Sequence, residues 1–194
     1  GAEILAPAGS YRRGKETVSG VDLVAVGAEP LLERLVAHPG VSEVLARDTV
    51  RFGLEGLRVT LHVVPRAEFG SALQRLTGSE EHNAALGAAP APAETEEQVY
   101  AALGLAWIPP ELRENQGEIE AAARNCLPDL VQHGQIRGDL HMHTIESDGR
   151  ATLEEMAAVA QALGYEYIAV TDHSKALAMA NGLDERRAVD FARR

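Results

Sequence analysis

Two histidines two residues apart, followed by an aspartate, are the feature of this sequence that most constrains its fold. His141 and His143 stand on an expected short strand, and Asp148 follows in the next loop. Residues i and i+2 of a strand point to the same face, so both imidazoles and the carboxylate can converge. These ligand types suit zinc, manganese or iron. The stretch 139–149 therefore predicts a metal site at a strand end.

A second predicted strand follows the first, and a predicted helix lies between them. Residues 165–171 are rich in strand-forming side chains and are predicted to form the second strand. The helix is predicted over residues 152–163, because Thr152 and Glu155 form a capping box and Gly164 supplies a stop. Strand, helix and strand in this order predict a parallel pair, with functional groups at the carboxyl ends of both strands.

The second strand runs into Asp172 and His173, which places another histidine at a strand end. A single histidine is more often an ordinary surface or core residue than a ligand. Four candidate ligands in one strand–helix–strand frame favour the metal interpretation instead, with His141, His143, Asp148 and His173 as the predicted ligands. Asp172 has two open roles, a partner that orients His173 or a cap of the loop.

These residues carry a resemblance to a known family. The runs 139–144, 147–149 and 170–174 resemble the first two metal motifs of the polymerase and histidinol phosphatase (PHP) domain family. The resemblance implies a distorted (β/α)7 barrel, a cluster of divalent metals, with Mn or Zn expected here, and hydrolysis of phosphate esters. Residues 139–194 are too few to close such a barrel, so an incomplete one is expected, without the family's later ligands.

Composition limits the remaining classes of protein. The chain is 45% hydrophobic and has one cysteine, Cys126, which excludes an internal disulfide framework and fits a reducing compartment. No apolar stretch is long enough for a membrane span, and no export segment is expected. The net charge of −11 argues against a broad nucleic-acid-binding surface, although Arg12, Arg13 and Lys15 form one basic cluster.

The amino-terminal half carries a second motif. Gly9 and Ser10 precede this basic cluster, and a strand over residues 21–27 carries Asp22. Such a loop can cradle a phosphate through its backbone N–H groups, its hydroxyl and the Arg13 guanidinium, although an ordinary turn beside a basic patch is the commoner explanation. Together with Asp22, the motif resembles the signature of the family X DNA polymerases, of the nucleotidyltransferase superfamily.

Later segments extend this resemblance in the family's order. The alternating residues 57–65 resemble the palm strand that carries a catalytic carboxylate, and residues 76–83 resemble the nucleotide-pocket turn, with Gly78 and Asn83 as substrate-binding candidates. Residues 94–113 resemble the end of the thumb in the bacterial branch, where a PHP domain follows. The family's additional amino-terminal domains are missing, and residues 87–93 read as a flexible linker, so we expect a fragment or a set of joined segments.

The departures from the family concern catalysis. The resemblance places the three metal-binding aspartates at Gly20, Asp22 and Thr60, so only Asp22 remains as a catalytic candidate. Two metals held by carboxylates normally stabilise the attacking and the leaving oxygen, and one aspartate binds them poorly. An aromatic pair that flanks the sugar is replaced by Arg75 and Leu76. His62 lies on the expected site face, where a half-exposed strand residue is the simpler interpretation.

The predicted fold class is α/β: an α+β palm with an antiparallel or mixed sheet, a small thumb, and the start of a PHP-type barrel. The expected modules are palm 1–70, thumb 71–125, linker 126–138 and PHP segment 139–194. The resemblance implies a cytoplasmic, nucleoid-associated, monomeric DNA repair enzyme that acts on gapped or 3′-end DNA with deoxynucleotides. It would join gap filling, using Mg or Mn if the palm is active, to 3′–5′ exonuclease or 3′-end processing. The alternatives are a silent polymerase frame that only binds DNA for the nuclease, and a small-molecule PHP phosphoesterase.

Overall fold

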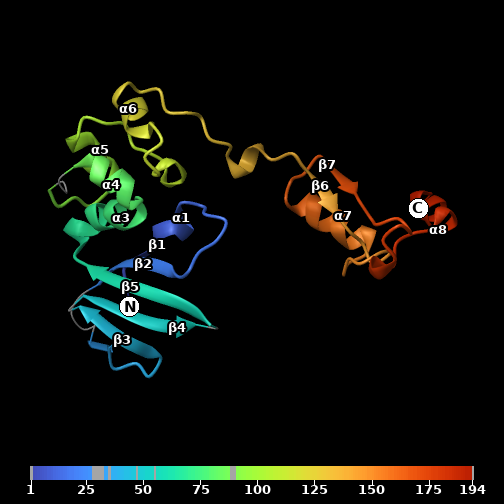
Figure 1. Cartoon of the computed structure of the whole chain (residues 1–194), viewed down its shortest axis with the longest axis horizontal. Helices are drawn as coiled ribbons and strands as arrows, with labels where there is room; N and C mark the ends of the chain where they lie inside the picture. The colour runs from blue at the N-terminus through green and yellow to red at the C-terminus, as the bar shows by residue number, and fades with distance from the viewer. Residues whose placement is uncertain are drawn as a thin grey trace. The chain divides into compact units, whose positions relative to one another are not determined.

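The computed structural model describes residues 2–27, 33–34, 36–46, 48–54, 56–87 and 91–193 (Figure 1). The chain divides into two compact units, Gly1–Pro128 and Asp129–Arg194, and each is considered by itself. The border lies within the predicted linker 126–138. The finer division of the first unit into palm and thumb modules stays a prediction.

A five-stranded mixed sheet forms the base of the first unit. The strand order is β1-β2-β5-β4-β3, with β2 parallel to β5 and the other neighbours antiparallel. This confirms the predicted mixed α/β character. The strands are β1 (Ile4–Ala8), β2 (Val21–Val26), β3 (Val41–Ala46), β4 (Thr49–Leu54) and β5 (Leu57–Val64).

The alternation predicted for residues 57–65 is seen in β5. Val59, Leu61 and Val63 are buried, whereas Thr60 and His62 are only partly covered. One face of the sheet packs through Val24 and Val64 against α3, and the opposite face has its own core cluster. Period-two alternation gives a sheet these two faces, so the polar residues of β5 share the face that α3 covers in part.

Helices follow the last strand of this unit. Ser79 caps α4 by accepting the N–H of His82, and Thr95 with Gln98 forms a capping box at α5. A third core cluster, centred on Tyr100 and Ile108, holds these helices together. The helical segments are α1 (Gly9–Arg12), η1 (Arg66–Glu68), α3 (Phe69–Thr77), α4 (Glu80–Leu86), α5 (Glu96–Ala102), η2 (Pro110–Leu112) and α6 (Glu118–Ala123).

A buried ion network joins α1 to α5. The Glu96 carboxylate is 5% exposed and accepts two bonds of 2.8 Å from Arg12 and one of 2.5 Å from Arg113. The Arg113 guanidinium also lies over the rings of Tyr100 and Trp107. Buried charges are tolerated only when they are paired in this way, so the network fixes α1 against the helices.

The second unit contains the predicted strand–helix–strand motif. Strands β6 (Gly138–Met142) and β7 (Tyr167–Val170) are parallel, and α7 (Leu153–Ala162) connects them. Thr152 and Glu155 form the predicted capping box, and Gly164 has a φ of +78° just past the helix. Within the described residues this sheet has two strands, so no barrel closes. The remaining segments are η3 (His133–Gln135), η4 (Ala178–Ala180) and α8 (Glu185–Ala192).

Two sequence predictions fall partly outside the described residues. One is a helix over residues 30–38, which the helical spacing of Leu31, Leu32, Leu35 and Val36 predicts. The other is the flexible linker over residues 87–93. Among the helices that the structure describes, none combines the length and apolarity required to cross a membrane.

Candidate metal centre and palm surface

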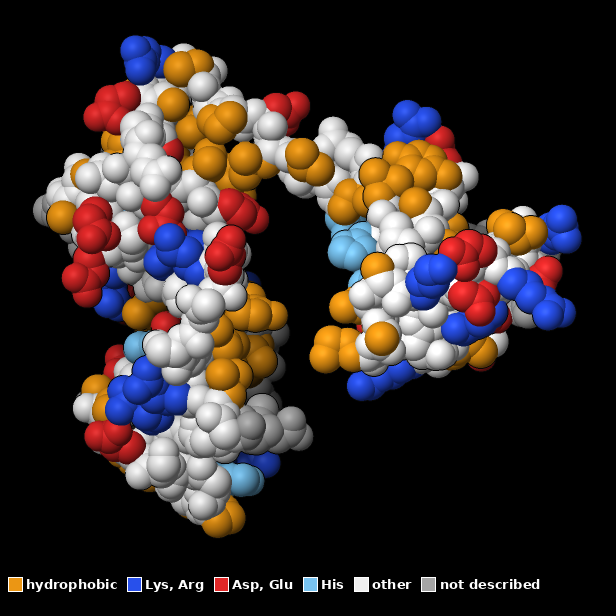
Figure 2. Space-filling model, turned by 45° about the vertical axis from the view of Figure 1, so that its right-hand side comes forward, with side chains coloured by type: hydrophobic (Ala, Val, Ile, Leu, Met, Phe, Trp, Pro, Cys, Tyr) orange, Lys and Arg blue, Asp and Glu red, His pale blue; other side chains and the backbone are white. Residues whose placement is uncertain are grey.

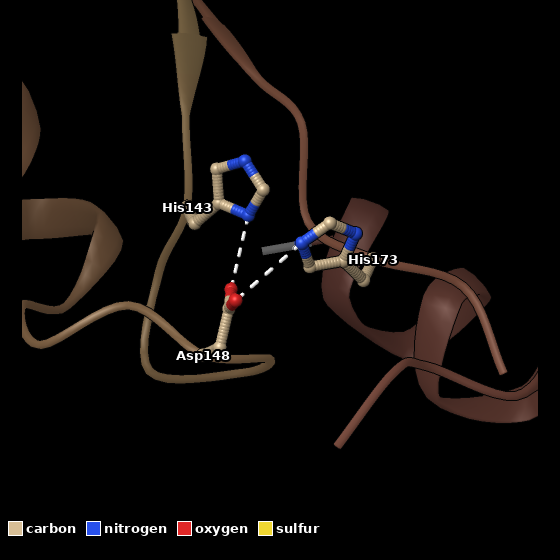
Figure 3. Close-up of side chains that lie close together, drawn as sticks. All are labelled: His143, Asp148 and His173. Carbon is tan, nitrogen blue, oxygen red and sulfur yellow. Dashed lines mark hydrogen bonds and ion pairs between the residues drawn. The ribbon is translucent and has the colours of Figure 1, made fainter. Parts of the chain in front are cut away.

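His143, Asp148 and His173 converge at the carboxyl ends of β6 and β7 (Figure 3). Asp148 lies between the two imidazoles: one carboxylate oxygen is 3.0 Å from Nδ1 of His143, and the other is 3.4 Å from Nε2 of His173. The two rings have centroids 4.5 Å apart. Figure 2 shows histidine side chains at the surface of this unit, where an ion from solvent can reach them.

The spacing of these atoms fits a shared divalent ion. Bonds of about 2.1 Å in a tetrahedral arrangement place neighbouring ligand atoms roughly 3.4 Å apart. One ligand atom from each of the three side chains can be chosen so that all lie within 4.8 Å of one another. Within the described parts of the chain, this is the one group of three or more His, Cys, Asp or Glu side chains with such spacing. The donor set therefore fits zinc or manganese.

His141 lies beside this cluster without joining it. Its ring centroid is 5.2 Å from that of His143, as expected for residues i and i+2 of a strand. The side chain is exposed, and the backbone N–H of His141 donates to the carboxylate of Asp139 at 3.0 Å. Its role as a fourth ligand stays a prediction.

A short loop carries Asp148 back toward His143. Gly149 donates its N–H to the carbonyl of Thr144 at 2.8 Å, which closes the turn. A Cβ added at Gly149 would lie only 2.0 Å from the His143 carbonyl oxygen. The close approach of two backbone segments therefore requires glycine at this position.

The Asp172 carboxylate anchors the same loop. It accepts the N–H of Thr144 at 2.8 Å, the hydroxyl of Thr144 at 2.7 Å and the hydroxyl of Ser147 at 2.5 Å. Of the two roles left open by the sequence, these contacts favour the loop cap. Desolvation raises the pKa of Asp172, but the bonds from Ser147 and Thr144 outweigh it and hold the pKa below its ordinary value.

The Asp148 carboxyl is also held in its charged form. Desolvation raises its pKa, but the hydrogen bond from His143 and the electrostatic interaction with the His173 and His143 rings outweigh this effect, so the pKa of Asp148 lies below its ordinary value. An ionised carboxylate and imidazole lone pairs are the states that bind a divalent cation.

Asp22, the predicted palm aspartate, lies beside Gly9. A Cβ added at Gly9, whose φ is +66°, would lie 2.5 Å from an Asp22 carboxylate oxygen. The parallel register pairs Asp22 with Thr60, so the three family positions adjoin, as the resemblance implies. No group of three metal-ligating side chains includes Asp22 among the described residues.

The position of Gly20 has little space for a side chain. An added Cβ would lie 2.7 Å from the carbonyl oxygen of Arg58 and 3.3 Å from its Nε. The Arg58 guanidinium in turn donates to Ser19. A positive group thus lies where the family resemblance places a metal-binding carboxylate.

The predicted phosphate-binding residues differ in their availability. Ser10 is partly exposed on α1, and its hydroxyl has no hydrogen-bond partner among the described residues. Arg13 instead donates from Nε to Glu114 at 2.7 Å and from Nη1 to the Thr77 carbonyl at 2.8 Å. Lys15 also pairs with Glu114, at 3.0 Å. Arg13 is therefore largely occupied in holding the helices to α1.

Gly78 and Asn83 lie together at the turn between α3 and α4. The Asn83 amide donates to the carbonyls of Arg75 and Gly78 and accepts from Gln74, so it braces the turn. A Cβ added at Gly78 would lie 2.6 Å from the Asn83 amide oxygen. Asn83 also lines a cavity of about 340 Å³, together with Arg75 and Asp48. Substrate binding by Gly78 and Asn83 stays a prediction.

His62 is half-buried in the sheet, next to β4. Its Nδ1 is 3.3 Å from the Thr49 hydroxyl. Burial lowers the pKa of His62, opposed by the negative charges of Asp22 and Asp48. Because His62 belongs to no ligand cluster within the described residues, the simpler interpretation as a strand residue is favoured.

Two supporting residues were not predicted from the sequence. Glu114 neutralises Arg13 and Lys15, and Arg187 of α8 donates to the carbonyl of Glu146 in the loop before Asp148, at 2.5 Å. Each residue bonds a partner far away in the sequence, so no local motif could indicate its role. The helical capping by Asp184 is the one local signal near Arg187.

Comparisons with known proteins match two segments of the chain. Residues 84–114 match the family model described as DNA polymerase beta thumb, and residues 139–192 match the PHP domain. The chain is 33% identical over 207 residues to "DNA polymerase/3'-5' exonuclease PolX" of Bacillus subtilis (strain 168). That alignment covers 93% of this chain and 36% of the relative, so the chain spans about a third of the relative's length.

Proposed function

We infer that this chain belongs to the bacterial family X DNA polymerases that carry a PHP domain. From this premise we propose that its second unit supplies a metal-dependent phosphoesterase, which acts on the 3′ ends of DNA. The proposal rests on one observation above all. One ligand atom each from His143, Asp148 and His173 lie within 4.8 Å of one another.

The ligands have defined tasks in this proposal. His143 and His173 offer neutral nitrogen lone pairs, and Asp148 adds a negative charge between them. Divalent metals bound by such groups activate water and neutralise phosphate oxygens, which is the chemistry that phosphodiester cleavage needs. Manganese or zinc suits the donor set. His141, on the adjacent strand position, is proposed to bind a metal from the same side.

The first unit is proposed to hold DNA without catalysing nucleotidyl transfer. Thr60 and Gly20 supply no carboxylate beside Asp22, so the negative charge that holds a pair of divalent metals is missing. The backbone of Arg58 limits the space at Gly20, so an aspartate there would require the strands to shift. The partly exposed Ser10 hydroxyl, which has no hydrogen-bond partner among the described residues, can still bind a backbone phosphate.

The surface of the first unit supports only local contacts with DNA. Figure 2 shows acidic and basic side chains interspersed on the visible face, without a continuous basic stripe. Together with the net charge of −11, this favours a small number of phosphate contacts. The proposed partner is therefore DNA held near a 3′ end or gap, and because few phosphates are contacted, the binding should weaken only modestly with salt.

The test is a product-length assay on a gapped, end-labelled DNA duplex with Mn²⁺ and deoxynucleotides. Full-length protein is compared with His143→Ala and Asp22→Ala, and His133→Ala serves as a matched control, because His133 lies in the same unit outside the ligand cluster. We expect shortening from the 3′ end, lost in His143→Ala and kept in the other two variants.

Three outcomes would contradict the proposal. Extension that is lost in Asp22→Ala would show that the palm polymerises despite its missing carboxylates. Shortening that survives in His143→Ala would remove the second unit as the nuclease. Cleavage of small phosphomonoesters but not of DNA would favour the small-molecule phosphoesterase.

A further inference from the structure

A carboxylate at the neighbouring strand end anchors the loop between His143 and Asp148. This is the Asp172 carboxylate, which accepts three hydrogen bonds from Thr144 and Ser147. Thr144 is fully buried and Ser147 is 8% exposed, whereas Asp172 is half-buried, so these bonds are partly shielded from water. Shielded bonds to a charged acceptor are the strong ones, and they are expensive to leave unmade.

Each bond has a direct consequence for a proposed ligand. Thr144 follows His143 in the chain, so fixing its N–H and hydroxyl fixes the end of β6. Ser147 precedes Asp148, and its hydroxyl also lies 3.3 Å from the Asp148 carboxylate oxygen that faces His143. Asp172 itself precedes His173. The Asp172 carboxylate thus binds the chain neighbours of His143 and Asp148, and Asp172 is itself the chain neighbour of His173.

The Asp172 side chain does not orient the His173 ring by a direct hydrogen bond. Within the described residues, no hydrogen bond joins the Asp172 carboxylate to either imidazole. His173 is held through its backbone instead, because its carbonyl accepts the N–H of Leu183 at 2.7 Å. The side-chain contacts of Asp172 are therefore directed to the loop.

We propose that Asp172 is a positioning residue, which sets the distance between His143, Asp148 and His173 by binding Thr144 and Ser147. The inference depends on the proposed metal site. An amide at position 172 keeps one acceptor oxygen, but its NH₂ group would face a donor of Thr144 or Ser147. Partners of this kind around metal ligands typically change metal affinity by about 10–100-fold when they are lost.

The test follows Co²⁺ binding to the full chain by the visible absorption of the bound ion. Asp172→Asn and Thr144→Val are expected to weaken Co²⁺ binding by about 10–100-fold. Thr144→Ser, which keeps the hydroxyl, should bind like the unmodified chain. Asp190→Asn, an exposed aspartate of α8 paired with Arg186, is the matched control for loss of a carboxylate. Unfolding of the metal-free variants by urea reports whether each one folds.

The results separate this inference from the proposed function. No Co²⁺ binding by the unmodified chain would overturn both. Equal affinity of the unmodified chain and Asp172→Asn would overturn the positioning role alone. Weak binding in Asp172→Asn with unchanged binding in Thr144→Val would mean that Asp172 contacts the ion or His173 directly, which also overturns it. If Asp172→Asn fails to fold, the Thr144→Val and Thr144→Ser pair decides the question.

Discussion

Substitution of Gly149 by alanine adds one methyl group, and the structure predicts that it disrupts the proposed metal centre severely. The added methyl group would lie 2.0 Å from the His143 carbonyl oxygen and 2.4 Å from the carbonyl carbon. These are backbone atoms, so no side-chain rotation can relieve the contact. The loop or the end of β6 has to move.

The size of the movement can be worked out from these distances. An ordinary contact begins near 3.4 Å, so the two backbone segments must separate by about 1.4 Å. Metal ligands need to be held within about 0.5 Å of their working geometry. We therefore expect Zn²⁺ affinity to fall by at least about 100-fold, or about 2.7 kcal/mol. The metal-free chain should lose about 1–3 kcal/mol of unfolding free energy, because the loop is overpacked.

Isothermal titration calorimetry with Zn²⁺ measures the first quantity, and urea unfolding of the metal-free chain measures the second. Gly134→Ala is the matched control, because Gly134 lies in the same unit, has no positive φ and has open space around an added Cβ. A Gly149→Ala variant that binds Zn²⁺ as tightly as the Gly134→Ala control would refute the claim that this loop positions the ligands.

Three further predictions concern stability and metal dependence. Glu96→Gln should cost about 3–5 kcal/mol of unfolding free energy in urea denaturation, since it leaves the buried Arg113 without its charge partner, while exposed Glu97→Gln should cost almost nothing. As a neutral ring, His82 donates to Glu118 and accepts from Tyr100, and burial lowers its pKa below the ordinary 6.5. The unfolded chain therefore binds the proton more readily, so the free energy of unfolding should fall as the pH drops below about 6.5. The His82→Gln variant should show a smaller pH dependence. A chelator should abolish 3′-end shortening, and Mn²⁺ or Zn²⁺ should restore it in the unmodified protein but not in His173→Ala; restoration in that variant would argue against the ligand set.

Local sequence determined much of the second unit. The capping box at Thr152 and the stop at Gly164 are read from single residues and act within one helical turn, so the helix between two strands was predictable. The two-residue spacing of His141 and His143 also fixes their common face, because the side-chain period of a strand is two. In the first unit, the alternation of residues 57–64 predicted which side of β5 is buried.

Long-range contacts decided the rest. The sequence placed Asp172 next to His173 but left its role open, and only the packing of β6 beside β7 brings its carboxylate to Thr144 and Ser147. Arg13 carries the same guanidinium whether it binds a phosphate or a protein group. Here Glu114, 101 residues away in the chain, accepts from its Nε, and the Thr77 carbonyl accepts from its Nη1. Hydrogen bonds and ion pairs have no sequence period when their partners come from different elements. Their identity is therefore set by the tertiary fold, whereas the local pattern sets the helices, the strands and the ligand types.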